Sequence, residues 1–245
     1  VAAAGGKVVL ECRPQLTRLF GSLEGVETCV SLGDELPAFD VHAPLMSLPR
    51  VFATTLETVP DTVPYLVVPD GISTDARIAA AAGLKVGLAW AGSPTRVDNH
   101  KRSVGFRELA PLLGVDGVSL FSLQVGDASE QLAGFNEPPA VTDLSLAFKD
   151  FADTAAAVAE LDLIISVDTS VLHLAGALGK PCWGLMSQPT GFLWMDERAD
   201  SPWYPSLRLF RQPKPGDWAT VIEAVVAQLR RVVSEGGAAA LSPPH

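Results

Sequence analysis

The residues best suited to chemistry stand where a short apolar run gives way to polar side chains. The run covers residues 161–167 and reads as a buried parallel strand. Four polar residues follow it closely: Asp168, Thr169, Ser170 and His173. We expect a helix to begin at Asp168 as its N-cap and to end at Gly179, with Pro181 beyond it. Free N–H groups and the positive end of the helix dipole favour a phosphate or diphosphate oxygen at such a start.

Two of these side chains are spaced to act together. Thr169 and His173 are four residues apart, so they share one face of the expected helix and can reach the same anion. A second interpretation fits the same residues equally well. In that interpretation Asp168 only caps the helix, the two hydroxyls satisfy backbone groups, and His173 is a hydrogen-bonded core histidine. The residues alone leave both interpretations open.

A second polar stretch, residues 91–103, follows the strand expected at 86–90. Its hydroxyl and cationic side chains include Ser93, Thr95, Lys101 and Arg102. Hydroxyls can bind phosphate oxygens, and either cation can pair with a second phosphate charge. Taken alone, the stretch reads as a solvated loop with Ser103 as a helix cap. Because the carboxyl ends of parallel strands meet at one edge of a sheet, we expect this loop to lie beside Asp168.

Strands and helices alternate along most of the chain, which predicts an α/β fold with a doubly wound parallel sheet. From residue 85 on, strands are expected at 86–90, 118–124, 140–142, 161–167, 182–186 and 207–210. Helices are expected at 106–113, 129–135, 153–160, 169–178 and 217–235. The N-terminal part is expected to hold strands at 8–11, 28–32, 39–43 and 65–68, and a helix at 14–23.

The turn near Pro69 is the expected boundary between two units. We predict a partial N-terminal Rossmann-like domain over residues 1–69 and a hinge helix over 70–84. A second domain is expected over 85–235 and a flexible tail over 236–245. The chain opens without Met on an Ala- and Gly-rich segment, which we interpret as the end of a helix whose preceding strand has been left out. A processed or disordered terminus is the other interpretation.

Composition argues against several classes of protein. The 245 residues carry 18 basic and 28 acidic side chains, and the net charge of −10 disfavours partners such as nucleic acid or an anionic membrane surface. No apolar run approaches the roughly 20 residues of a transmembrane helix, so we expect a cytoplasmic protein. The scattered cysteines and histidines lack metal-ligand spacing, which predicts no structural metal and no disulfide framework. No G-x-G-x-x-G follows an expected strand, which disfavours a dehydrogenase.

Five segments carry a longer pattern: 86–94, 101–103, 150–155, 161–181 and 201–206. Together they resemble the heptosyltransferase-like glycosyltransferases of the GT-B fold, in particular the branch that is often fused to tetratricopeptide repeats. The resemblance is strongest at 168–181. It implies two Rossmann-like domains that face each other across a cleft, the second of which holds the nucleotide-sugar donor. It also implies that no metal and no other cofactor is required.

The resemblance further implies roles for individual residues. It implies a donor-diphosphate site made of six residues: Ser93, Lys101, Asp168, Thr169, Ser170 and His173. Lys101 would neutralise phosphate charge as the leaving group departs. Gln124 and Met186 would line the nucleoside pocket. The acidic base of relatives lies near a first strand and Gly-rich turn that this sequence lacks, so Asp40 and His42 are the candidate bases among the residues present.

The predicted function is transfer of a sugar from a nucleotide-diphosphate sugar to a glycan or protein acceptor. An upstream repeat domain would bind protein partners. One alternative is a catalytically inactive nucleotide-sugar-binding or scaffold module attached to protein-interaction repeats. The other is a sugar-nucleotide epimerase, which would convert the sugar without an acceptor.

Overall fold

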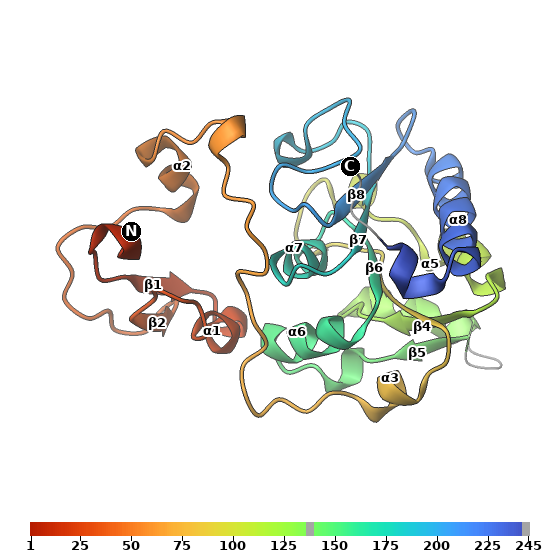
Figure 1. Cartoon of the computed structure of the whole chain (residues 1–245), viewed down its shortest axis with the longest axis horizontal. Coiled ribbons are helices and arrows are strands. Elements are labelled where there is room, and N and C mark those ends of the chain that lie inside the picture. Colours follow the sequence, from red (N-terminus) through yellow and green to blue (C-terminus); the bar gives the residue numbers. More distant parts are fainter. Residues whose placement is uncertain (136–139, 242–245) are drawn as a thin grey trace.

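Two parallel sheets of unequal size organise the chain (Figure 1). The computed structural model describes residues 1–135 and 140–241. The small sheet pairs β1 (Val9–Cys12) with β2 (Thr28–Ser31). The large sheet has six strands in the order β5-β4-β3-β6-β7-β8. Its strands are β3 Leu84–Ala89, β4 Val118–Ser122, β5 Val141–Asp143, β6 Leu163–Val167, β7 Cys182–Met186 and β8 Leu207–Arg211. The predicted α/β fold with a parallel sheet is confirmed.

Helices connect the strands of the large sheet and cover both of its faces (Figure 1). The helices are α1 Pro14–Phe20, α2 Leu48–Val51, α3 Ala76–Ala80, α4 Asn99–Arg102, α5 Phe106–Leu109, α6 Phe151–Glu160, α7 Ser170–Ala177 and α8 Trp218–Ser234. The chain winds outward from β3 through β4 to β5, then restarts at β6 on the other side of β3. In sheets of this kind, ligands bind beyond the carboxyl ends of the strands where the order reverses. That point lies between β3 and β6.

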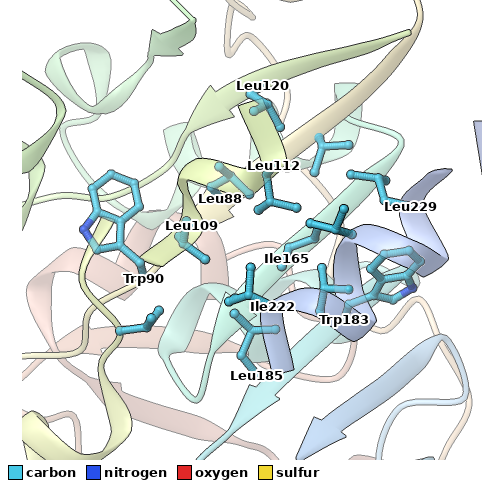
Figure 2. Close-up of a cluster of buried hydrophobic side chains, with 14 of the residues drawn as sticks. Leu88, Trp90, Leu109, Leu112, Leu120, Ile165, Trp183, Leu185, Ile222 and Leu229 are labelled. Atoms are coloured by element: carbon cyan, nitrogen blue, oxygen red, sulfur yellow. The ribbon is translucent and has the colours of Figure 1, made fainter. Parts of the chain in front are cut away.

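Two apolar layers hold the large sheet between its helices. One layer lies against α5 and α8, and Figure 2 shows Leu88, Ile165, Ile222 and Leu229 meeting in it. The other layer lies against α6 and α7. The long helix α8 carries its apolar side chains at intervals of three and four residues, which is why one of its faces is buried along its length. The loops at the carboxyl edge of the sheet are therefore mounted on a packed frame.

The helix α1 attaches the small sheet to the large unit. Leu19 on α1 is 1% exposed and packs into the apolar layer that contains α6. Beside it, Arg18 Nη2 lies 2.7 Å from Asp150 Oδ1 and 2.5 Å from Asp153 Oδ1, both at the start of α6. Apolar packing of α1 and a branched ion pair thus join the two units.

Two of the strands predicted in the N-terminal part do not form. Residues 39–43 lie in an exposed loop bracketed by prolines, which donate no backbone hydrogen bond to a ladder. Residues 65–68 pair with none of the described strands. The N–H groups of Tyr65 and Leu66 instead donate to the carbonyl of Ala177, at distances of 3.0 and 3.2 Å. The segment after the small sheet is therefore bound to the end of α7.

Two predicted helices are also different in the structure. The helix expected at 106–113 continues after Leu109 as a 3-10 turn, Ala110–Gly114, because Pro111 has no N–H for the next helical hydrogen bond. The helix expected at 129–135 is a 3-10 segment, Asp127–Phe135. At 9 residues it is a long run for this form, which occurs mostly in short pieces.

The predicted flexible tail over 236–245 falls partly on residues 242–245, outside the described residues. Before them, Gly237–Ala240 forms a 3-10 turn, and Leu241 packs against the apolar layer under α8. Within residues 1–135 and 140–241, no helix combines the length and the apolar character needed to cross a membrane.

Candidate functional site

The start of α7 lies directly after β6, at the carboxyl edge of the large sheet (Figure 1). The N-cap is Thr169, so the prediction that Asp168 caps the helix is wrong. The Thr169 backbone is extended, but its hydroxyl binds Ser166 Oγ at 2.9 Å and does not cap the helix. Among the described residues no side chain caps the first N–H groups of α7, so they can bind an anion.

The end of α7 follows the prediction. The helix closes at Ala177, and Gly179 takes a left-handed φ of 68° two residues later. A residue with a Cβ is strained in that conformation, which is why glycine marks the helix end in the sequence. The segment 161–181 therefore forms the predicted strand–helix unit, with its helix start displaced by one residue.

The carboxylate of Asp168 does not cap α7, because it is paired with the guanidinium of Arg102. Asp168 Oδ2 lies 2.7 Å from Arg102 Nη2, and the same nitrogen donates to the carbonyl of Asp168. The side chain of Arg102 is 12% exposed, and its Nε is buried without a hydrogen-bond partner in the part of the chain that the structure describes. Its neighbour Lys101 is exposed on α4. The structure therefore brings Arg102, and not the predicted Lys101, to Asp168.

His173 lies one turn into α7 within a group of aromatic side chains. Its Nδ1 is 3.0 Å from Tyr204 Oη. Its ring stacks on Trp194, with centroids 5.0 Å apart and an interplanar angle of 24°. Burial lowers the pKa of His173, the charge of Asp168 opposes this, and Arg102 adds to it. At neutral pH His173 is therefore an uncharged hydrogen-bonding group.

The loop after β3 is held at its two ends by the polar side chains of Gln124 and Ser103. Gln124 Oε1 accepts from the N–H groups of Trp90 and Ala91 at 3.0 and 2.9 Å. Ser103 Oγ accepts from the Gly92 N–H at 3.1 Å. Since Gln124 is 5% exposed and its amide also donates to two backbone carbonyls, its side chain braces the loop. The sequence placed Gln124 in the lining of a nucleoside pocket, whereas both polar atoms of its side chain are hydrogen-bonded to the backbone of this protein.

The remaining predicted residues lie in different surroundings. Ser93 is exposed in the loop, and its hydroxyl lies 2.8 Å from Thr95 Oγ1. Met186 is fully buried in the apolar layer next to α7, so the structure contradicts its prediction as a pocket-lining residue. Asp40 and His42 are exposed in the loop after β2. Among the described residues neither of them makes a hydrogen bond or an ion pair with the residues around α7.

Three residues of this arrangement lie outside the predicted set: Arg102, Trp194 and Tyr204. Arg102 was visible in the sequence as an alternative to Lys101. Trp194 and Tyr204 belong to the irregular segment between β7 and β8, where no periodicity marks one aromatic residue over another.

The assembled site has the donors of an anion site. It combines the uncapped start of α7, the hydroxyl of Ser170, the guanidinium of Arg102 and the neutral imidazole of His173. In the part of the chain that the structure describes, no three His, Cys, Asp or Glu side chains gather closely enough to hold a metal ion.

Comparison with known proteins places this site within a family segment. Residues 81–193 match the family model of glycosyltransferase family 9 (heptosyltransferase). Protein FlbA of Caulobacter vibrioides is 31% identical over 156 residues, which are 60% of this chain and 25% of FlbA. The chain therefore spans about a quarter of the length of this relative.

Two solved structures share the fold at low sequence identity. The ADP-heptose LPS heptosyltransferase II of E. coli superposes with a TM-score of 0.57 at 14% identity, over 93% of this chain and 92% of that one. The glycosyl transferase family 9 structure from Veillonella parvula DSM 2008 gives a TM-score of 0.51 at 12% identity, over 94% and 89%. The chain thus shares a GT-B-type α/β fold with these two structures, and its residues 81–193 match the model of glycosyltransferase family 9 (heptosyltransferase).

Proposed function

We propose that this chain binds the diphosphate of a nucleotide-sugar donor at the start of α7 and takes part in transfer of the sugar to an acceptor. The observation that carries the proposal is the position of Arg102. Its guanidinium lies against Asp168 at the uncapped end of α7, at the reversal of strand order between β3 and β6. The match of the same segment to the family 9 model supports a nucleotide-sugar substrate.

In this proposal the groups at the start of α7 stabilise the leaving group, which is the nucleoside diphosphate. When the glycosidic bond to the donor breaks, negative charge grows on the departing diphosphate. Donors that are already fixed in place stabilise that charge without reorganising. The N–H groups of α7, the hydroxyl of Ser170 and the guanidinium of Arg102 are such donors, and no metal is needed in this scheme. Lys101 and Ser93, both exposed on the same loop, would meet the outer oxygens of the ligand.

The acceptor hydroxyl also needs a base, and the residues around α7 do not supply one in this scheme. Asp40 and His42 remain the candidates for that role. The proposed acceptor of the sugar is a glycan or a protein.

The test is selective stabilisation by nucleoside diphosphates. We expect ADP or UDP, or one of their sugars, to raise the thermal transition, because a ligand that binds only the folded state stabilises it by mass action. Arg102→Gln should weaken that binding on the order of tenfold or more, since a charge-assisted hydrogen bond is lost. Arg107→Gln, on the exposed side of α5, is the matched control and should bind like the wild type. If no nucleotide shifts the transition, the proposal is wrong.

One observation favours a second candidate, a module that binds the donor without turning it over. The two candidate bases lie in an exposed loop, apart from the residues around α7. Incubation of the protein with the donor it binds separates the two candidates. Release of the nucleoside diphosphate supports transfer or hydrolysis, whereas tight binding with no product favours the silent module.

A further inference from the structure

Tyr204 contacts the imidazole of His173 from a fixed position. Its ring is 8% exposed and packs on α7 at Gly176, where a Cβ would lie 2.4 Å from the ring. Only glycine, which has no Cβ, leaves room at this position for the phenol ring to pack against the helix. The hydroxyl therefore meets Nδ1 of His173 at 3.0 Å with the ring held against the helix.

The plane of the imidazole is fixed from the other side by Trp194. That indole is 1% exposed and stacks on His173. The segment that carries it is braced by Arg211, whose Nε donates to the carbonyl of Arg198 at 2.8 Å and whose Nη1 donates to Thr190 Oγ1 at 3.0 Å. His173 consequently has a set ring plane and a set partner for one of its two nitrogens.

The hydrogen-bond inventory then decides where the imidazole proton lies. A neutral imidazole has one N–H donor and one acceptor nitrogen. Two groups face the Tyr204 hydroxyl: His173 Nδ1, at a hydrogen-bond distance of 3.0 Å, and the phenol of Tyr65. A buried hydroxyl proton needs an acceptor, and a neutral imidazole nitrogen accepts more strongly than the phenol oxygen of Tyr65, which assigns the Tyr204 hydroxyl as the donor and Nδ1 as the acceptor. The proton of the imidazole is left on Nε2.

We propose that Tyr204 is a positioning residue, whose hydroxyl holds His173 in the tautomer with the proton on Nε2, so that Nε2 can donate to the donor diphosphate. This inference rests on the function proposed above. Burial raises the pKa of Tyr204, and burial lowers the pKa of His173, so both groups are neutral near pH 7 and the tautomer is defined there. The role of Tyr204 would be to choose which nitrogen donates, without contact with the ligand.

The first test reads the tautomer directly, without any ligand. Long-range proton–nitrogen NMR correlation on nitrogen-15-labelled protein distinguishes the two neutral tautomers, and His173→Asn identifies the signals by their loss. We expect the wild type to carry the proton on Nε2 and Tyr204→Phe to lose that preference while keeping its thermal transition, since the ring still packs on Gly176. A wild-type proton on Nδ1 would overturn the proposal.

Tyr65 provides the matched control for this test. Its charge and its side-chain hydrogen bonding also raise the pKa of Tyr204, so it is the other phenol that faces this hydroxyl, and it is half exposed. If Tyr204 donated to Tyr65 instead, the imidazole would carry its proton on Nδ1, and Tyr65→Phe would change the tautomer. We expect Tyr65→Phe to leave it unchanged.

The second test measures ADP and UDP affinity by titration calorimetry. Tyr204→Phe should weaken binding by roughly tenfold, the scale of one hydrogen bond to a charged group, while Tyr65→Phe binds like the wild type. If the wild type binds neither nucleotide, the proposed function fails and the NMR result still decides the tautomer. If the wild type binds and Tyr204→Phe binds as tightly, the positioning role is overturned and the proposed function stands.

Discussion

Arg102 occupies the centre of the candidate site in an unusual state. One of its nitrogens binds Asp168, while its Nε is buried and makes no hydrogen bond with the residues that the structure describes. A buried N–H of a charged group without an acceptor is costly. An oxygen from a ligand or from water would satisfy it. This is a residue-scale reason to expect anion binding beside Asp168.

Gly176 is a position where an added methyl group should lower the stability of the folded protein. We expect Gly176→Ala to lower the free energy of unfolding by roughly 1–3 kcal/mol, the range for overpacked cores, because the new Cβ meets the ring of Tyr204. Urea denaturation measures the loss. Gly134→Ala is the control, since a Cβ at that exposed glycine meets nothing within 4 Å. Equal losses in the two variants would contradict the packing argument.

The three cysteines are free thiols, and two of them lie side by side on β1 and β2, with Cys12 Sγ and Cys29 Sγ 3.5 Å apart. Burial raises the pKa of Cys29 to about 11 and that of Cys182 to about 12. Both groups are therefore protonated, unreactive thiols at neutral pH.

Alkylation rates should report this protection. We expect the labelling of Cys29 by iodoacetamide to rise on the order of 100-fold from pH 7 to pH 9, because the thiolate fraction grows tenfold per pH unit below the pKa. Cys182, which is fully buried, should stay unlabelled until urea unfolds the chain. Peptide mass spectrometry separates the sites. Rapid labelling of Cys182 in the folded protein would contradict its burial.

At the scale of elements, two carboxylates at the start of α6 together cap the helix and bind α1. Asp150 caps the helix by accepting from the N–H of Ala152 at 2.8 Å. Asp150 and Asp153 also share the guanidinium of Arg18 from α1. The acidic residues that contribute to the family resemblance at 150–155 thus serve a structural contact between the two units.

Removal of the ion pair between Arg18 and the start of α6 should lower the stability of the protein by a small but measurable amount. We expect Arg18→Ala to lower the free energy of unfolding by about 1 kcal/mol at low salt, the upper end for partly exposed pairs, and by less at high salt. Lys7→Ala is the control, because its pair with Glu27 is exposed and joins the two segments that lead into β1 and β2. If Lys7→Ala lowered the free energy of unfolding as much as Arg18→Ala does, the ion pair between the units would contribute no more stability than an exposed surface pair.

The same contact predicts a pH dependence. Burial tends to raise the pKa of Asp153, but the Lys149 N–H and the Arg18 guanidinium outweigh it and hold that pKa below its ordinary value. The stabilisation is therefore present above about pH 4, the ordinary range of an Asp, and is lost as the pH falls through the lowered value. Wild type and Arg18→Ala should differ in urea at pH 7 and converge in acid, once the pH has fallen through the lowered pKa of Asp153. A difference that persisted in acid would contradict the ion pair.

At the scale of the whole molecule, burial is unevenly divided. Most of the exposed large apolar side chains lie within residues 32–67, among them Phe39 at 55% and Phe52 at 54%. The six-stranded unit instead buries its apolar residues in two layers. The two units should therefore differ in their resistance to proteases.

Limited proteolysis tests this division. We expect chymotrypsin to cut first after Phe39 and Phe52, because exposed loops with few backbone hydrogen bonds fit a protease best. The segment from β3 to α8 should persist as the resistant product, identified by mass. First cuts within that segment would show that the six-stranded unit is not the stable part of the molecule.

The sequence was sufficient for the large α/β unit because its signals are local. Apolar runs fixed the central strands, the three-and-four spacing fixed α8, and Gly179 with Pro181 fixed the end of α7. The segment 39–43 was misread as a strand because a few apolar residues between prolines imitate one. Its pairing partner would have to come from elsewhere in the chain, which no local pattern records.

What the sequence determined by itself was the fold class, the family resemblance and the edge of the sheet where polar residues gather. Only the tertiary structure decided that Arg102 meets Asp168, 66 residues away, and that Tyr204 meets His173, 31 residues away. It also moved Gln124 and Met186 from the predicted pocket into bracing and core positions. The physical reason is that a contact between distant residues depends on strand order and loop path, which periodicity along the chain does not specify.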